Sequence, residues 1–352
     1  MSMWMHGESK NPWKSLMNKK ILDVRNLKVI FRTEEGIVPA VDGVSFAAFS
    51  GKTLGLVGES GCGKSVSALS VIRLIPDPPG KITDGEIIWK GTDLLKMPDR
   101  KWTDIRGRRI AMIFQEPMTS LNPVFTVGRQ LGEVLSLRFG LKGEKAEKRI
   151  IEMLDFVGIS DPSSRIQAFP HELSGGMMQR IMIAMALLTE PDLLIADEPT
   201  TALDVTIQAQ ILRLIKNIQK KNGMAVILIT HDMGVVAETC DHVSVMYAGR
   251  IVETGGVRDI FERPLHPYTS GLLRSIPQKG SSREKPLPTI EGTVPSMLDL
   301  PGGCRFSPRC FRRKEMGEKD RDQCTTHDPG LRSIGEDRGV ACHFPLEGSF
   351  HS

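Results

Sequence analysis

A glycine-rich stretch between two apolar segments carries the first residues that could do chemistry. It reads Gly58-Glu59-Ser60-Gly61-Cys62-Gly63-Lys64-Ser65. The run 53–57 before it predicts a strand, and the run 66–72 after it predicts a helix. Glycines let the loop backbone curl so that successive N–H groups point inward at a helix start, which makes a cradle for phosphates. Lys64 would then reach the β- and γ-phosphates, and the Ser65 hydroxyl would ligate Mg²⁺.

The simplest alternative for this stretch is a flexible glycine loop before a helix, with no ligand. The short pattern alone also fits that alternative. The strand and helix that flank it are the context a phosphate loop requires, so we favour nucleotide binding.

Two adjacent carboxylates follow another apolar segment. The run 192–196 predicts a buried strand, and Asp197 and Glu198 come directly at its end. The carboxyl ends of parallel strands are where α/β proteins bind their ligands. One carboxylate can hold Mg²⁺, and the other can act on a water molecule. A helix cap is the structural alternative, which Pro199 and the upstream phosphate loop disfavour.

Two more polar side chains come at predicted strand ends. Gln115 follows the short apolar run 108–114, and His231 follows the run 225–230. Taken alone, each is more often a solvated glutamine or a structural histidine. Together they would reach the same sheet edge as the carboxylates, where a glutamine can contact a bound ion or water.

A second predicted helix start also suits phosphate. Ser174 stands where an N-cap residue belongs, and Gly175 and Gly176 leave the first turn bare before the apolar run 181–188. Exposed N–H groups at a helix start attract anions. A capped core helix with no ligand explains the pattern equally well.

Bulk composition limits the class of protein. The chain has 352 residues, enough for one large core and a smaller domain. Its 46 basic and 42 acidic side chains give a net charge of +4, too small to indicate a nucleic-acid partner. No apolar run approaches the roughly 18 to 20 residues of a membrane span. Residues 1–20 lack a hydrophobic signal core and predict a flexible tail, so we expect a cytoplasmic protein that meets a membrane through a partner.

Apolar patterns predict the elements that carry these residues. Alternation in 21–31 and 41–49 predicts a β-hairpin, and 85–89 predicts a third strand. Segment 127–157 has a helical period with a glycine-containing turn inside it, and 205–221 predicts an amphipathic helix. An α/β fold is therefore expected.

With these residues in place, the sequence resembles the nucleotide-binding subunit of ABC transporters over about residues 21–277. The motifs of that family occur in order: Walker A at Gly58 to Ser65, the Q-loop Gln115, the signature Leu173-Ser174-Gly175-Gly176-Met177-Met178-Gln179, Walker B ending in Asp197-Glu198, the D-loop Ala202-Leu203-Asp204 and the switch His231. The one departure is Met177-Met178, where the family often has Gln or Glu and a polar residue. It leaves the backbone phosphate donors unchanged.

The resemblance implies a P-loop ABC-type nucleotide-binding domain with a RecA-like core, an antiparallel β subdomain and a helical subdomain. We expect this domain at 21–263, with the helical subdomain at about 118–190, after the tail at 1–20. A small C-terminal module with four cysteines would occupy 264–352.

The resemblance also implies which residues handle ATP and Mg²⁺. The expected catalytic residues are Lys64, Gln115, Glu198 and His231. Glu198 would polarise the attacking water, and His231 would contact the γ-phosphate. Ser65, Gln115 and Asp197 would order Mg²⁺, directly or through water. Residues expected at the nucleotide are Phe31, which looks like the adenine-stacking aromatic, Gly58, Glu59, Ser60, Gly61, Cys62, Gly63, Lys64, Ser65, Val66, Gln115, Ser174, Gly175, Gly176 and Asp204.

Segments 261–277 and 303–310 are similar to the oligopeptide/dipeptide importer group. This implies one ATPase of a pair, bound at the cytoplasmic face of the membrane to two permeases that an external solute-binding protein feeds. Ser174 and Gly176 would then serve the ATP of the second ATPase. The group also includes nickel and oligosaccharide importers. The alternatives of another class are a soluble ABC ATPase, which the short stretch between Gln115 and Ser174 disfavours, and a redox or metal-binding protein whose ATPase is regulatory.

Four of the six cysteines lie near the C-terminus: Cys304, Cys310, Cys324 and Cys342. Such a group in a reducing compartment is more often a metal or redox site than a disulfide framework. The paired C-x2-C spacing of zinc ribbons is missing, and thiolate ligation also suits a [4Fe-4S] cluster, which some members of the importer group carry there. We favour the cluster over zinc and over free thiols. Cys62 in the loop and Cys240, predicted in a helix, are expected to be structural.

Overall fold

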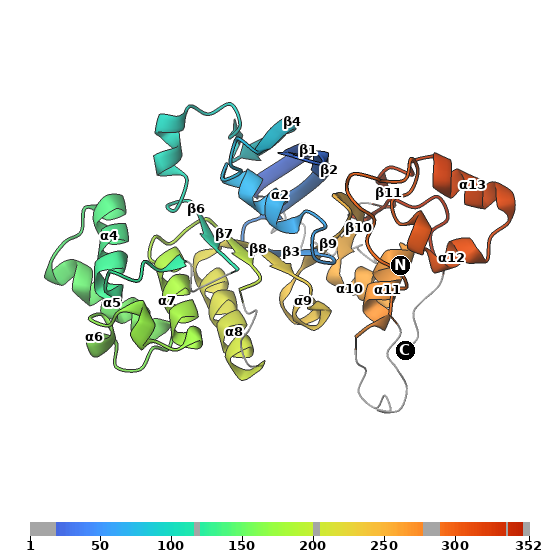
Figure 1. The fold of residues 1–352 in the computed structure, drawn as a ribbon. Coiled ribbons are helices and arrows are strands. Elements are labelled where there is room, and N and C mark those ends of the chain that lie inside the picture. Colours follow the sequence, from blue (N-terminus) through green and yellow to red (C-terminus); the bar gives the residue numbers. More distant parts are fainter. Residues whose placement is uncertain (1–18, 116–119, 200–204, 277–288, 336, 348–352) are drawn as a thin grey trace, which may run out of the picture.

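The computed structural model describes residues 19–115, 120–199, 205–276, 289–335 and 337–347. A central sheet carries a smaller sheet, drawn in blue, above it in Figure 1. Helices drawn in green lie to one side of the central sheet. The C-terminal segment, which here means the described residues from 257 onward, is drawn in orange and red and lies to the other side. Residues 1–18 of the expected tail at 1–20 lie outside the described residues, and Lys20 already begins the first strand.

Within the described residues, the central sheet has eight strands in the order β11-β12-β10-β9-β3-β8-β7-β6. The strands from β9 to β6 are parallel, whereas β10, β12 and β11 pair antiparallel. Their bounds are β3 Thr53–Val57, β6 Ile110–Ile113, β7 Leu193–Asp197, β8 Ala225–Thr230, β9 His242–Tyr247, β10 Arg250–Gly256, β11 Arg332–Ser333 and β12 Gly339–Val340.

Side chains on the two faces of this sheet enter different cores. Leu194 and Ala196 pack with the helical part of the protein, while their neighbours Leu193 and Ile195 pack with the smaller sheet. Successive side chains of a strand point to opposite faces. Covering on both faces explains why these central strands are almost wholly apolar, which is what made them recognisable in the sequence.

The smaller sheet is antiparallel, in the order β2-β1-β4-β5. Its strands are β1 Lys20–Thr33, β2 Gly36–Phe49, β4 Gly80–Trp89 and β5 Thr92–Asp93. The predicted hairpin is confirmed, and its ladder continues to the pair Thr33 and Gly36, beyond the predicted strand ends. The predicted third strand is confirmed as β4, which pairs with β1.

A helical part follows β6. It consists of α4 Val127–Phe139, α5 Glu144–Phe156, α6 Pro162–Arg165 and α7 Gly175–Leu187. The predicted helical segment with an internal turn is confirmed. The Thr126 side chain accepts from the N–H of Arg129 at the start of α4, and Gly140 ends that helix in a left-handed conformation, φ 67°. Such C-terminal positions favour glycine because it has no Cβ.

The other helices pack around the central sheet and the C-terminal segment. They are α2 Lys64–Val71, α8 Val205–Asn222, α9 Met233–Thr239, α10 Val257–Glu262, α11 Pro267–Arg274, α12 Phe311–Lys314 and α13 Glu318–Thr326, with short 3₁₀ turns η1 Asp99–Asp104, η2 Pro170–Glu172 and η3 Ser307–Arg309. Cys240, predicted within a helix, instead follows α9 as its C-cap. Among the helices described, none is long and apolar enough to cross a membrane.

The C-terminal segment joins the central sheet directly. β12 pairs with β10 through Glu253 with Val340 and Thr254 with Gly339, and β11 continues the ladder. The same segment packs Phe306 against Tyr247 of β9 and Tyr268 of α11, with ring centroids 5.2 and 5.4 Å apart. Its side chains therefore come within reach of the loop that follows β3.

Candidate active site

The phosphate loop connects the buried strand β3 to α2, as the sequence predicts. Gly58, Gly61 and Gly63 have φ values of 150°, 76° and 100°. A Cβ atom on Gly58 would lie 2.2 Å from the carbonyl oxygen of Met246, and one on Gly63 would lie 2.4 Å from that of Ala40. Both positions therefore require glycine, for conformation and for space.

Lys64 turns its ammonium group back over this loop. Its Nζ donates to the carbonyl oxygens of Gly58 and Glu59, at 2.8 and 2.9 Å, and the residue is only 5% exposed. A buried cation at a helix start suits the binding of an anion such as a phosphate group. Cys62, which is 1% exposed, lies beside it with its Sγ 3.7 Å from Nζ.

The two carboxylates occupy the end of β7, which lies between β8 and β6 in the central sheet. The Ser65 hydroxyl donates to Oδ1 of Asp197 at 3.1 Å, which joins the helix start to this strand end. Burial raises the pKa of Asp197, and the neighbouring Glu198 carboxylate adds to the effect, while the Ser65 hydroxyl and Lys64 partly oppose it. Removing this carboxylate from water disfavours its charged form.

Glu198 has an uncommon backbone conformation, with φ 45°. A non-glycine residue in the left-handed region costs about 1 to 3 kcal/mol, and such strain gathers at functional sites. The N–H of Glu198 donates to the carbonyl oxygen of Ile229 on β8 at 2.9 Å, which holds the strained turn against the sheet.

Gln115 and His231 both contact the Glu198 carboxylate. Gln115 Nε2 donates to Oε2 at 3.3 Å, and His231 Nδ1 lies 3.1 Å from Oε1. These residues follow β6 and β8, the strands on either side of β7. The structure thus brings the polar groups from four adjacent strand ends to one edge of the sheet.

The other residues expected to contact the nucleotide lie apart from the cluster around Glu198 or fall outside the described residues. Ser174 caps α7, where it accepts from Met177 N at 3.3 Å, and Ser174 and Gly175 are exposed. Figure 1 shows α7 among α4 to α6, apart from α2 and its loop. Phe31 packs partly buried in the smaller sheet and pairs with Val38 of β2, the strand that reaches the loop through Ala40. Asp204, with the rest of the predicted D-loop, lies outside the described residues.

Two residues that contact the loop were missed by the sequence reasoning. The N–H of Glu59 donates to the Tyr268 hydroxyl at 2.9 Å, and Arg309 binds the Glu59 carboxylate. Tyr268 stands in the segment used for the resemblance, but nothing in its spacing indicates a contact with a loop so far away in the chain. No local signal marks Arg309 either.

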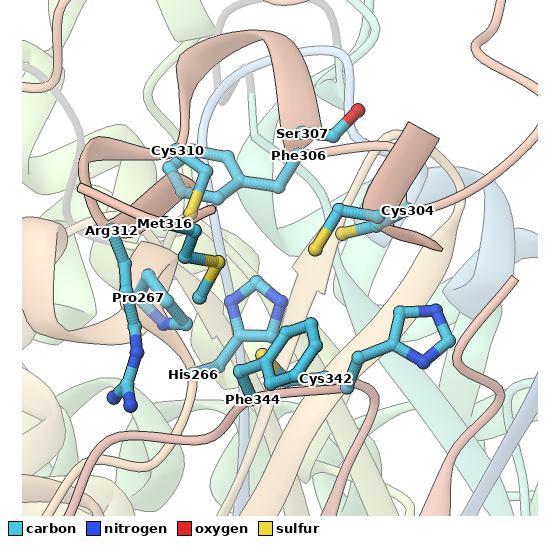
Figure 2. A pocket seen from close by; sticks show the side chains of 12 residues that line it. His266, Pro267, Cys304, Phe306, Ser307, Cys310, Arg312, Met316, Cys342 and Phe344 are labelled. Carbon is cyan, nitrogen blue, oxygen red and sulfur yellow. The ribbon is translucent and has the colours of Figure 1, made fainter. Parts of the chain in front are cut away.

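The four C-terminal cysteines line one pocket, with His266, Phe306 and Phe344 among its other walls. Figure 2 shows Cys304, Cys310 and Cys342 reaching this pocket from separate segments around His266. Its free volume is about 20 Å³, room for about one water molecule. Burial raises the pKa of Cys304 to about 11 and that of Cys342 to about 12, and also raises those of Cys310 and Cys324.

These thiols do not form a ligand set in this structure. Among the described residues, no group of three or more histidine, cysteine or acidic side chains is arranged to hold a metal ion. Metal ligation requires thiolates, and the burial that raises the pKa of these thiols adds to the cost of removing their protons. The predicted [4Fe-4S] cluster and the zinc alternative are therefore not supported by the residues as they lie.

Comparison with known proteins gives two matching families. The family described as "ABC transporter" matches residues 41–201, and "Oligopeptide/dipeptide transporter, C-terminal region" matches residues 252–316. A probable peptide ABC transporter ATP-binding protein from Sinorhizobium fredii is 55% identical over 290 residues, covering 82% of this chain and 87% of the relative. The dipeptide transport ATP-binding protein DppD from Bacillus subtilis is 54% identical over 295 residues, covering 84% of this chain and 88% of the relative.

A solved structure gives the same likeness. The dimeric ATP-binding cassette MJ0796, in a post-hydrolysis state bound to ADP and Pi, has a TM-score of 0.62 and 27% identity, and covers 68% of this chain and 99% of that one. The α/β P-loop fold of an ABC cassette, predicted from the sequence, is thereby confirmed. The C-terminal module with a four-cysteine site remains a prediction.

We expect Asp197→Asn to stabilise the nucleotide-free protein at neutral and alkaline pH. The folded-state pKa of Asp197 lies above the unfolded value of 3.8, so its ionised form costs stability that a neutral amide does not. The cost is absent below pH 3.8 and grows as the pH rises through the folded-state pKa. Thermal unfolding midpoints at several pH values measure it. Asp155→Asn, at an exposed position of α5, is the control and should give no gain. A pH-independent difference would contradict the assignment.

Proposed function

Because the chain belongs to the family of ABC transporter ATP-binding proteins, and within it to the oligopeptide/dipeptide transporter group, we propose that it hydrolyses ATP to power the import of di- or oligopeptides. The observation that carries the proposal is the cluster at the sheet edge. There Lys64 closes the loop, Ser65 contacts Asp197, and Glu198 contacts Gln115 and His231. The match of residues 252–316 to the transporter C-terminal region supports the peptide cargo.

The loop and its helix would hold the phosphates. Bound ATP with Mg²⁺ supplies the γ-phosphoryl group that is transferred to water. Lys64 and the loop N–H groups would stabilise the negative charge that this transfer spreads over the phosphate oxygens. Ser65 and Asp197, with Gln115, would hold Mg²⁺, which keeps Asp197 ionised despite its burial. The adenine would stack on Phe31.

Glu198 would orient the attacking water and accept its proton. Its carboxylate is held by Gln115 on one oxygen and by His231 on the other, so the orientation of the base is fixed before the water arrives. His231 would also contact the γ-phosphate. The strained backbone of Glu198 fits a residue whose position serves chemistry rather than stability.

The exposed start of α7 suits a site shared between two subunits. Ser174, Gly175 and Gly176 lie apart from the phosphate loop of their own chain, so they are available to the ATP of a second ATPase. Asp204 would lie at the same interface. We therefore propose a dimer with a second ATPase subunit, bound to two permeases at the cytoplasmic face of the membrane and served indirectly by an external solute-binding protein. The working units would be the domain at 21–263 and the module at 264–352.

Replacing Glu198 with Gln should leave nucleotide binding intact and stop turnover. The amide keeps the shape of the side chain but cannot accept the proton, and general-base groups typically contribute about 10² to 10⁴ in rate. Phosphate release and nucleotide binding, measured on the same preparation, separate the two effects. Lys64→Ala is the matched contrast and should weaken binding itself. Unchanged hydrolysis in Glu198→Gln would remove that residue from the base role.

The cargo is tested with the whole transporter. We expect the chain to co-purify with two permeases after a high-salt wash of membranes. In vesicles with the solute-binding protein, di- or oligopeptides should stimulate its ATP hydrolysis, and Glu198→Gln should abolish the stimulation. If oligosaccharides or nickel chelates stimulated hydrolysis and peptides did not, the transporter would be assigned that cargo in place of peptides. Co-purification with ribosomes or nucleic acid, and not with permeases, would indicate a soluble ABC ATPase.

For the four cysteines we propose a [4Fe-4S] cluster with a structural or redox-sensing role, and zinc as the second choice. Support comes from four thiols of separate segments that line one pocket. Binding would require the thiols to lose their protons and the pocket to widen, because the free volume is about 20 Å³. Cys304, Cys310, Cys324 and Cys342 would be the ligands.

Metal analysis of protein purified without oxygen tests this proposal. A cluster predicts about four irons and four acid-labile sulfides per chain with a visible absorption band, all lost in Cys304→Ser. Cys240→Ser is the matched control because that cysteine lies outside the pocket. Zinc alone would select the second choice, and protein free of both metals would leave four structural thiols.

A further inference from the structure

Glu59, within the phosphate loop, is held from three directions. Its carbonyl oxygen accepts from Lys64 Nζ at 2.9 Å, and its N–H donates to the Tyr268 hydroxyl at 2.9 Å. Its carboxylate accepts two hydrogen bonds from Arg309, at 2.6 and 3.0 Å. The second and third of these partners belong to α11 and η3, far along the chain. The loop is therefore fastened to the C-terminal segment at the residue that also positions Lys64.

The guanidinium of Arg309 is buried and fully used. Arg309 is 8% exposed, and its remaining N–H groups donate to the carbonyl oxygens of Glu291 and Ile290, at 3.1 and 3.3 Å. One nitrogen also lies 3.5 Å from the Tyr247 hydroxyl. A planar fork with two parallel bonds to a carboxylate fixes direction as well as distance, which a lysine cannot reproduce.

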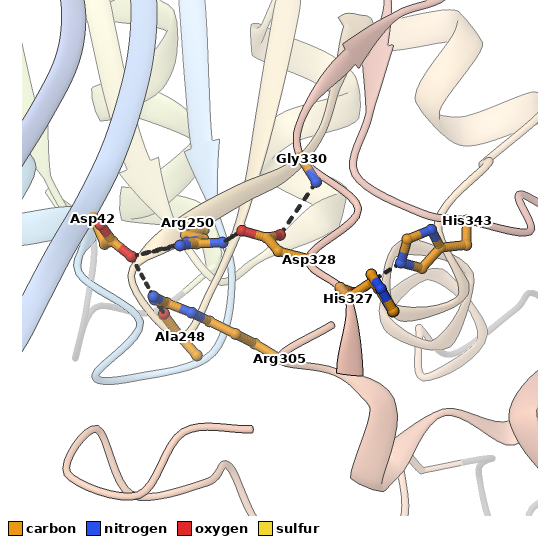
Figure 3. A network of polar contacts seen from close by, with 8 residues as sticks. All are labelled: Asp42, Ala248, Arg250, Arg305, His327, Asp328, Gly330 and His343. Carbon is orange, nitrogen blue, oxygen red and sulfur yellow. Dashed lines mark hydrogen bonds and ion pairs between the residues drawn. The ribbon is translucent and has the colours of Figure 1, made fainter. Parts of the chain in front are cut away.

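A neighbouring arginine of the same segment holds the other side of the loop region. Figure 3 shows that Arg305 donates hydrogen bonds to the Asp42 carboxylate and to the carbonyl oxygen of Ala248. Arg250 of β10 also donates to the Asp42 carboxylate. The N–H of Asp42 donates to the carbonyl oxygen of Gly249 at 2.9 Å. The N–H of Gly249 in turn donates to the carbonyl oxygen of Cys62 in the loop at 3.0 Å. The segment thus contacts both flanks of the phosphate loop.

The charges explain what Arg309 does for an anion site. The Glu59 carboxylate would otherwise add an uncompensated negative charge to a loop that must receive phosphates. The Arg309 side chain is 5% exposed and that of Glu59 is 28% exposed, so removing the arginine would leave a partly buried carboxylate without its partner, which is unfavourable. The pair also fixes the Glu59 peptide, and through it the carbonyl oxygens that orient Lys64.

We propose that Arg309 is a positioning residue for ATP: through Glu59 it neutralises and orients the phosphate loop, so nucleotide affinity depends on the C-terminal segment. This inference rests on the proposed role of the loop in binding phosphates. Within the described residues, Arg309 is the basic side chain that pairs with the Glu59 carboxylate, so this ion pair depends on the C-terminal segment.

Calorimetric titration of the full chain with Mg·ADP tests the proposal, since ADP cannot be turned over. Arg309→Met should raise the dissociation constant about tenfold or more, the scale of a lost hydrogen bond between charged groups. Arg309→Lys should recover part of the loss because it keeps the charge without the fork. Adding Glu59→Gln to Arg309→Met should restore part of the affinity, because the unpaired carboxylate is then gone.

Arg338→Met is the matched control. It breaks another buried pair of the C-terminal segment, Arg338 with Glu253, 15% and 0% exposed, which does not contact the loop. It should lower the thermal midpoint and leave the affinity for Mg·ADP unchanged. Equal loss of affinity in both variants, or parental affinity in Arg309→Met, would overturn the proposal. If Lys64→Ala also bound Mg·ADP like the parent, the proposed function of the loop would fail instead.

Discussion

The backbone of the phosphate loop runs so close to two neighbouring segments that side chains cannot fit between them. Gly58 faces the carbonyl oxygen of Met246 at the end of β9, and Gly63 faces that of Ala40 on β2. The loop is therefore shaped by both sheets at once. The orientation of its N–H groups, the reach of Lys64 and the start of α2 all depend on this contact, and so does any charge the loop can bind.

The opposite wall of the site depends on the order of the parallel strands. β6, β7 and β8 lie side by side, so Gln115, Glu198 and His231 meet although they are far apart in the sequence. One carboxylate connects all three. Such a network responds as a unit, because a change at any member alters the orientation of the base.

The C-terminal segment contributes more to the cassette than a terminal addition would. It extends the central sheet through β12, packs Phe306 on Tyr247 and Tyr268, and sends Arg309 to the loop. Cys310 follows Arg309 directly, so the cysteine pocket and the loop contact share one short turn.

The sequence by itself determined the strands that carry the candidate site, one helix cap and the loop, because these depend on short-range patterns. Apolar runs predicted β3, β7 and β8, and Ser174 marked the N-terminal start of α7. The sequence also carried enough family motifs, in the expected order along the chain, to identify the family. Only the tertiary structure decided that Arg309 meets Glu59, that β12 pairs with β10, and that Cys304 and the three other C-terminal cysteines line one pocket where burial raises their pKa values. Such contacts and pKa values arise from folded neighbours distant in the chain, which no local pattern encodes.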